Sequence, residues 1–188
     1  MKEWKLNNRQ IDSTFFSQRV ELRAGNLPDR SPLKVLDLLG GGYLLWEEVR
    51  KRTAREIDIL RIEKKGGKKG FYLIGDSRKF LFDYGDFDVV DLDGPGCPFL
   101  QLDRVMNAPR RPKTIFLTWI QQRPDKLPMQ FLNALGYPEP MVSKIPAIFA
   151  KGGQDKLLNY LALKAIKRVK MYFTPDRRKT FLSFQIEG

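Results

Sequence analysis

One stretch decides the fold: Val35-Leu36-Asp37-Leu38-Leu39-Gly40-Gly41-Gly42, an apolar run that contains a single acid and ends in three glycines. A short apolar run of this kind is typical of a buried strand. Glycine has no Cβ, so the turn after this strand exposes backbone N–H groups that a ligand can approach closely. Glycine turns also follow strands for purely structural reasons, and on this stretch alone the two interpretations are equally good.

Strands and helices are predicted to alternate along the chain on both sides of this stretch. Apolar and alternating patterns predict strands over residues 33–39, 56–62, 71–74, 87–92 and 113–119. Helices are expected over residues 44–52, 77–82, 99–106, 124–135 and 156–169. Segments 169–174 and 179–186 predict a closing antiparallel hairpin. The chain is therefore expected to be an α/β protein with a mostly parallel sheet, helices on both faces and ligands at the carboxyl ends of the strands.

Composition indicates one domain with one core. The chain has 188 residues, 42% of them hydrophobic, which suffices for a single ordinary core. We expect a domain over residues 32–188 and an N-terminal extension over residues 1–31. No apolar run approaches the roughly 20 residues that cross a bilayer, and the first five residues lack the apolar core of a signal peptide. A cytoplasmic location is expected.

Two features of the composition restrict the chemistry. The chain has no histidine, which excludes catalysis through imidazole and zinc sites with histidine ligands. Cys97 is the single cysteine, so neither an intramolecular disulfide nor a multi-cysteine metal site can form. Carboxylates are the available general bases. The net charge of +12 favours a polyanionic partner, nucleic acid first, although charge that serves only solubility is an alternative.

Acids follow several predicted strands where the carboxyl edge of the sheet should be. Glu63 ends the second strand 21 residues after Gly42, near the spacing of about 20 residues expected for a carboxylate that binds ribose hydroxyls. Asp76 follows the third strand and precedes Ser77. An acid there can accept a hydrogen bond from an adenine amino group, but an ordinary helix cap explains the pair equally well.

The order and content of these segments resemble the class I S-adenosylmethionine-dependent methyltransferases, over roughly residues 33–187. That resemblance implies a Rossmann-like fold with seven strands and a C-terminal antiparallel hairpin. It implies S-adenosyl-L-methionine as the cofactor. The cofactor residues that it implies are Asp37, Gly40, Gly41 and Gly42, with Glu63 at the ribose and Asp76 with Ser77 at the adenine.

The fourth predicted strand is more specific. Its end, Asp93-Gly94-Pro95-Gly96-Cys97-Pro98, resembles the Asp-Pro-aromatic-Gly-Ser-Pro segment of tRNA guanine-N2 methyltransferases, with direct matches at Asp93, Gly96 and Pro98. The resemblance implies that these three residues form the catalytic turn and that Asp93 holds the exocyclic amine and helps to take its proton. In-line methyl transfer needs alignment and a modest base but no histidine.

The chain also departs from these families. Gly94 replaces the family's proline, Pro95 replaces its base-stacking aromatic residue, and Tyr43 stands where a last glycine is expected. A non-catalytic nucleic-acid-binding or accessory protein on the same fold is therefore the alternative function.

Two other enzyme classes share single features with the chain. Cytosine-C5 methyltransferases attack the base with a cysteine that lies in the turn after the fourth strand, and Cys97 lies in the corresponding turn of this chain. A lone cysteine, however, more often packs as a small apolar residue. A nicotinamide or nucleotide-sugar enzyme shares the glycine turn and the distant acid, but it explains the fourth-strand turn and the hairpin less well.

Basic clusters suggest where a nucleic acid, RNA before DNA, could bind. They lie at residues 64–69, 104–113, 164–170 and 177–179, and any one of them could instead be solvated charge. The segment 15–21 could lie over the active cleft and add aromatic stacking and phosphate contacts. The leading hypothesis is N-methylation of a base in RNA, within tRNA processing. The oligomeric state is left open.

Overall fold

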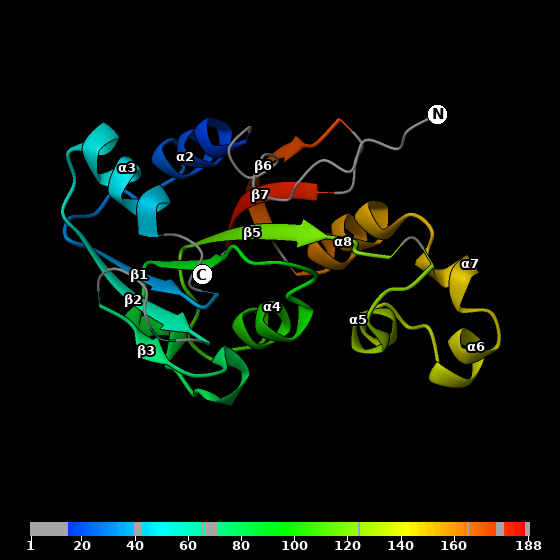
Figure 1. Cartoon of the computed structure of the whole chain (residues 1–188). Helices are drawn as coiled ribbons and strands as arrows, with labels where there is room; N and C mark the ends of the chain where they lie inside the picture. The colour runs from blue at the N-terminus through cyan, green and yellow to red at the C-terminus, as the bar shows by residue number, and fades with distance from the viewer. Residues whose placement is uncertain are drawn as a thin grey trace.

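A seven-stranded sheet in the order β3-β2-β1-β4-β5-β7-β6 runs through the computed structural model (Figure 1). The structure describes residues 15–39, 43–64, 66, 71–123, 125–164, 166–175 and 179–186. Strands β1 to β5 are parallel to one another, and β7 runs antiparallel between β5 and β6. The expected Rossmann-like sheet with a C-terminal antiparallel hairpin is confirmed. Its strands are β1 (Leu33–Asp37), β2 (Ile57–Glu63), β3 (Leu73–Ile74), β4 (Val89–Leu92), β5 (Thr114–Ile120), β6 (Ile166–Phe173) and β7 (Lys179–Ile186).

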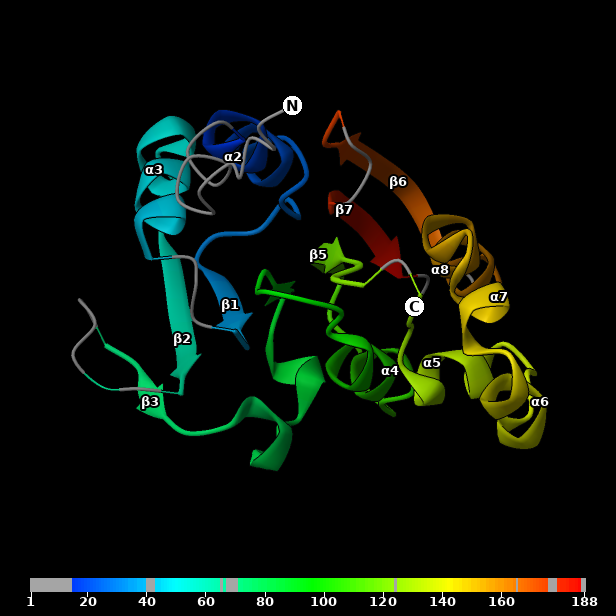
Figure 2. The same cartoon turned by 45° about the vertical axis from the view of Figure 1, so that its right-hand side comes forward.

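Helices cover both faces of the sheet (Figure 2). One face carries α2 (Phe16–Ala24) and α3 (Tyr43–Thr53), and the other carries α4 (Phe99–Met106), α5 (Met129–Ala134) and α8 (Gly153–Ala162). The short helices α6 (Glu139–Lys144) and α7 (Pro146–Ala150) lie between α5 and α8 in the chain.

The alternation of side chains along the strands divides the core into two layers. On β1, Leu33 and Val35 pack into the layer under α2 and α3, whereas Leu36 belongs to the layer under α4 and α8. The buried residues of α4 recur at helical spacing and give it one apolar stripe, which explains why its bounds match the predicted helix.

The C-terminal third departs from the predicted pattern. The helix expected over residues 156–169 ends at Ala162, and β6 already begins at Ile166. Pairing with β7 from Ile166↔Ile186 to Phe173↔Thr180 overrides the local helical pattern. The helix expected over residues 124–135 is shorter and begins after Pro128.

The helix expected over residues 77–82 is also absent. Two single 3₁₀ turns, Ser77–Lys79 and Tyr84–Asp86, replace it. The carboxylates of Asp76 and Asp83 each accept a hydrogen bond from the backbone N–H two residues later. Such local bonds compete with the hydrogen bonds of a continuous helix and hold the chain in short turns.

The described part of residues 1–31 packs onto the sheet. Val20 and Leu22 of α2 are buried in the same cluster as Trp46 of α3 and Phe181 of β7. The boundary expected at residue 31 stays a prediction, but α2 shares its apolar contacts with the domain that follows. None of the helices in the described ranges is long and apolar enough to cross a membrane.

Candidate active site

The carboxyl ends of the parallel strands bring the predicted acids to one edge of the sheet. Asp37, the last residue of β1, pairs in register with Arg61 of β2 and Asp91 of β4. Glu63 ends β2, and Asp93 follows β4 directly. Because neighbouring parallel strands end together, residues far apart in the sequence meet at this edge.

Asp37 shapes the start of the glycine turn. Its side chain is fully buried, and its Oδ1 accepts a hydrogen bond from the backbone N–H of Leu39 at 3.2 Å. Gly40, Gly41 and Gly42 lie outside the described residues, and α3 begins at Tyr43 directly after them. The predicted strand with its acid before the glycines and the predicted helix after them are confirmed.

The acids on the outer strands have different surroundings. Glu63 is largely buried, and its backbone carbonyl accepts a hydrogen bond from Gly75 N–H at 2.7 Å. Asp76 accepts hydrogen bonds from the side chain and backbone N–H of Arg78, which lower the pKa of its carboxyl. The Ser77 hydroxyl is buried and accepts a hydrogen bond from Gln101 on α4 at 3.2 Å. Asp76 is therefore a cap, as the structural interpretation expected, and its carboxylate also holds a guanidinium.

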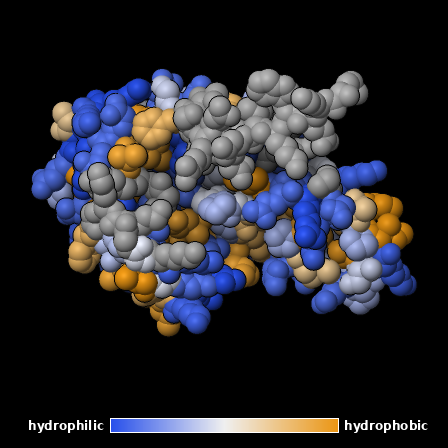
Figure 3. Space-filling model, viewed as in Figure 1, coloured by the Kyte–Doolittle hydropathy of each residue, from blue (hydrophilic) through white to orange (hydrophobic). Residues whose placement is uncertain are grey.

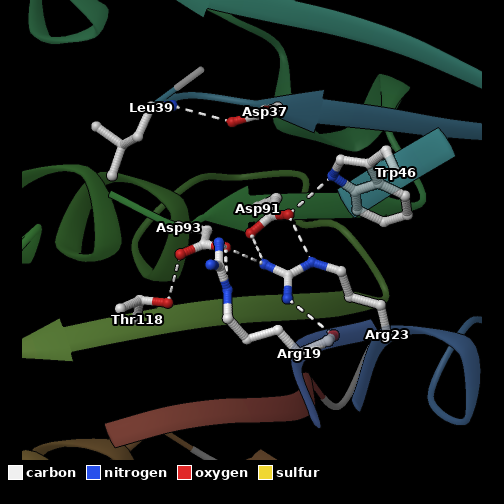
Figure 4. A network of polar contacts seen from close by, with 8 residues as sticks. All are labelled: Arg19, Arg23, Asp37, Leu39, Trp46, Asp91, Asp93 and Thr118. Atoms are coloured by element: carbon white, nitrogen blue, oxygen red, sulfur yellow. Dashed lines mark hydrogen bonds and ion pairs between the residues drawn. The ribbon is translucent and has the colours of Figure 1, made fainter. Parts of the chain in front are cut away.

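Two arginines of α2 bind the acids at the end of β4 (Figure 4). Arg23 donates from Nε to Asp91 Oδ2 at 2.9 Å and from Nη2 to Asp91 Oδ1 at 2.8 Å. The same Nη2 reaches Asp93 Oδ2 at 2.9 Å, and Arg19 forms a second ion pair with that oxygen. Two guanidinium groups thus meet two carboxylates inside the protein, and the formal charges cancel.

Neutral donors complete this cluster. The indole N–H of Trp46 donates to Asp91 Oδ2 at 2.9 Å, and the hydroxyl of Thr118 on β5 donates to Asp93 Oδ1 at 2.6 Å. Arg23 also lies over the rings of Trp46 and Phe116, at 5.8 and 5.2 Å from the ring centroids. The carboxylate of Asp93, directly after β4, is therefore fixed in position by donors from α2 and β5.

The ionisation of the cluster follows from its geometry. Burial acts to raise the pKa of Asp93, but Arg23 and Arg19 outweigh it and lower that pKa. Burial dominates at Asp91 and raises its pKa despite the attraction of Arg23. Burial acts to lower the pKa of Arg23, but the attraction of Asp91 and Asp93 outweighs it and raises that pKa. The lowered pKa of Asp93 makes its carboxylate a weak base.

The turn after β4 passes close to the turn after β1. A Cβ at Gly94 would lie 2.7 Å from Cδ1 of Leu39, so only glycine fits there without a shift. Gly96 has φ +98°, and its carbonyl accepts a hydrogen bond from Ile120 N–H at 2.8 Å. Pro98 is the N-cap of α4. The substitution of glycine for the family's proline therefore has a steric reason in this chain.

Cys97 precedes α4 by two residues and is partly buried against the hydrophobic core. Burial raises the pKa of its thiol well above the ordinary value. The thiolate is the reactive form of cysteine, so this environment disfavours the nucleophilic role.

Sequence reasoning did not identify Arg23, Trp46 and Thr118 as members of the cluster. It expected segment 15–21, which contains Arg19, over the active cleft, but it did not pair Arg19 with an acid. Arg19 and Arg23 stand four residues apart, which places both on one side of a helix. That spacing is the only local signal, because the contacts to Asp91 and Asp93 join residues 68 to 74 apart in the sequence.

The sheet order and the two helical layers together are those of the class I methyltransferase fold. No protein-family model matches the chain, and no curated protein sequence is detectably similar to it. Solved structures do share its fold. A possible exported protein from Bordetella parapertussis matches with a TM-score of 0.57 at 9% identity, over 96% of this chain and 68% of that one.

Two methyltransferases are among the similar structures. A putative methyltransferase of Haloferax volcanii, in complex with the methyltransferase activator Trm112, has a TM-score of 0.53 at 11% identity, with 94% of this chain and 93% of that one covered. Trm1 of Pyrococcus horikoshii, in complex with S-adenosyl-L-methionine, has a TM-score of 0.51 at 14% identity, over 96% of this chain. This chain spans 56% of the length of that Trm1 chain. At these identities the likeness shows the fold.

Proposed function

We propose that the protein is an S-adenosylmethionine-dependent methyltransferase that methylates a nitrogen of a base in RNA. One observation carries the proposal: the carboxylate of Asp93, directly after β4, is fixed by Thr118, Arg19 and Arg23 at the edge where the turn after β1 meets the turn after β4. The methyltransferase fold supports the reaction class. The match of Asp93, Gly96 and Pro98 to tRNA guanine-N2 methyltransferases supports the acceptor.

The cofactor site is proposed at the ends of β1, β2 and β3. Glu63 ends β2 as a largely buried carboxylate suited to ribose hydroxyls. The turn that contains Gly40 to Gly42, with Asp37 before it, would receive the amino-acid part of the cofactor, and Asp76 with Ser77 would contact the adenine. The residues present fit an adenosine cofactor because a buried acceptor at β2 and a capped turn after β3 stand on adjacent strands.

Asp93 is proposed to orient the acceptor nitrogen. Bound S-adenosylmethionine supplies an electrophilic methyl group on a sulfonium. Asp93 Oδ2 already meets both guanidinium groups, whereas Oδ1 accepts only the Thr118 hydroxyl among the contacts described and keeps a lone pair for an amine N–H. Because its pKa is lowered, Asp93 takes the amine proton only after the nitrogen has gained the methyl group and become cationic.

The same cluster supports the second candidate function. Two arginines neutralise Asp93, and Gly94 with Pro95 leaves the turn without the aromatic residue that stacks on the target base in the family. A non-catalytic nucleic-acid-binding protein on this fold would keep such a cluster for stability alone.

Isothermal titration calorimetry with S-adenosylmethionine and S-adenosylhomocysteine separates the two candidates. We expect heat and a raised melting temperature with both ligands. If neither S-adenosylmethionine nor S-adenosylhomocysteine binds, the methyltransferase function is excluded.

Methyl incorporation into RNA from labelled S-adenosylmethionine tests the role of Asp93. Asp93→Asn keeps the shape of the side chain and should reduce incorporation at least about 100-fold, the lower range for an acid–base residue, with little change in cofactor affinity. The matched control is Asp83→Asn, an exposed cap paired with Arg110 at the opposite edge of the sheet. Equal turnover in the two variants would remove Asp93 from the mechanism.

A further inference from the structure

Strand β6 is the outermost strand beside β7 and is exposed along most of its length. Six of its eight residues have exposed side chains. Tyr172 and Phe173 are 39% and 42% exposed, large values for aromatic side chains in a sheet. Figures 1 and 2 show β6 beyond β7, on the side of the sheet away from β1.

The register connects the exposed Tyr172 to the candidate active site. Tyr172 pairs with Phe181 of β7, and Phe181 pairs with Thr118 of β5. Paired residues on adjacent strands project from the same face, so these three side chains form one row. Thr118 holds Asp93, and Arg19 lies over the Phe181 ring at 5.9 Å. With strands about 4.8 Å apart, Tyr172 lies about 10 Å from Thr118 along this row.

The charge on β6 is of one sign. Lys167, Arg168 and Lys170 are all exposed, and the strand contains no acid. Lys170 pairs with Ser183, so it projects from the same face as Tyr172 two residues later. We call Lys167, Arg168, Lys170 and Tyr172 the β6 surface.

The backbone of β6 disfavours a further strand as the occupant of this edge. The register shifts between Lys167 and Lys170, and Arg168 has φ +52°. A bulge and edge lysines both interrupt the regular hydrogen bonding that strand addition requires. Side chains, not backbone groups, are what this edge offers a partner.

We infer that the β6 surface binds single-stranded nucleic acid, with phosphates at the basic residues and a base stacked on Tyr172. Positive side chains that alternate with an exposed aromatic ring are the combination that holds single strands. Phe181, which stands between Tyr172 and Thr118, is buried against Phe15 and Arg19. The row therefore gives the distance from Tyr172 to the candidate site and is not a surface on which the strand lies. The inference rests on the proposed function in taking RNA as the ligand, and it adds a binding surface for that RNA.

The experiment is fluorescence anisotropy with a labelled single-stranded RNA oligonucleotide, without cofactor, on the full chain. Tyr172→Ala removes the stacking ring and should weaken binding at least about fivefold, the lower end for the loss of one base stack. Tyr172→Phe keeps the ring and should bind as the natural protein does. Lys170→Ala should make the slope of log K against log salt shallower by about 0.7, the value for one phosphate contact on a single strand.

The matched control is Lys51→Ala, which removes an exposed lysine from the far end of α3. Lys51→Ala should lower the affinity for RNA only by the unspecific effect of one lost charge. Added to Tyr172→Ala, it should leave the loss of affinity caused by Tyr172→Ala unchanged. Melting curves verify that each variant is folded. Unchanged affinity of Tyr172→Ala, or equal losses for Tyr172→Ala and Tyr172→Phe, would overturn the inference.

Failure of this inference is distinguishable from failure of the proposed function. RNA binding through Tyr172 without any binding of S-adenosylmethionine would keep the β6 surface and exclude the methyltransferase. If the protein binds the cofactor and transfers the methyl group, and Tyr172→Ala binds RNA as well as the natural protein does, the methyltransferase function stands and the β6 surface is excluded as the RNA-binding site. Equal affinity for double-stranded RNA of the same length would also contradict stacking on Tyr172, because paired bases are not free to stack there.

Discussion

At the scale of single residues, Arg23 is the most consequential side chain of the cluster. It is 2% exposed and forms ion pairs with two carboxylates that are themselves buried. A buried ion pair contributes little net stability compared with apolar residues, but the loss of one partner leaves an uncompensated charge. The arginine is thus needed because Asp91 and Asp93 are present.

Arg23→Ala is expected to lower the free energy of unfolding by about 3–5 kcal/mol. The matched control is Arg52→Ala, since Arg52 pairs with Glu21 across the exposed side of the same α2–α3 interface. That change should cost at most about 1 kcal/mol. Urea unfolding measures both variants. A similar loss in the two would mean that the buried cluster has no special energetic role.

The pair of Asp76 and Arg78 predicts a pH dependence of stability. The hydrogen bond from the Arg78 side chain lowers the pKa of Asp76 in the folded protein. The unfolded chain therefore binds the proton first, near pH 4, and the contribution of the pair is complete above that pH. It is lost as the pH falls toward the folded value.

Urea unfolding of the natural protein and of Asp76→Asn between pH 7 and pH 3 checks this sign. The natural protein should be more stable near neutral pH, and the difference should narrow below about pH 4. In an Arg78→Ala background the difference should be small at every pH. If the difference in stability between the natural protein and Asp76→Asn grows as the pH falls, the predicted direction of the pH dependence is wrong.

At the scale of elements, local patterns predicted those elements that pack through their own periodicity. The β1 strand and the α3 and α4 helices match because one run or one stripe defines each of them. The C-terminal hairpin was predicted, but β6 begins at residue 166 and not at 169, because pairing with β7 overrides the helical spacing of these residues. The turns after β3 failed because two aspartate caps interrupt the helix, a competition that helical spacing alone does not reveal.

Helix α2 tests whether residues 1–31 are separable from the domain. Leu22 is 2% exposed in the cluster with Trp46 and Phe181. Leu22→Ala should lower the free energy of unfolding by about 2–5 kcal/mol in one cooperative transition. Ser17→Ala on the exposed side of the same helix should change it by less than about 0.5 kcal/mol. An unchanged main transition in Leu22→Ala would support an independent extension.

At the scale of the whole molecule, parallel topology made the acidic half of the site predictable. Once strands 33–39, 56–62 and 87–92 are parallel neighbours, Asp37, Glu63 and Asp93 must meet at one edge. The basic half was not predictable in the same way, because α2 precedes the sheet and no strand order specifies where it packs. Tertiary structure alone brings Arg19 and Arg23 to these acids.

The surface has polar and apolar regions of different extent. Figure 3 shows hydrophobic residues in several places on this face, among them the end formed by α6 and α7. Met141, Ile145 and Ile148 in this region are each more than half exposed.

The separation of Arg23 from Asp91 has a consequence for the newly made chain. The two residues lie 68 positions apart, with the arginine first. At about 5–20 residues per second, the arginine is added to the chain about 3–14 s before its acid. During that interval the α2 segment has no acid at the end of β4 to bind. The α2 segment therefore cannot form its buried ion pairs until the residues that follow β4 have been made.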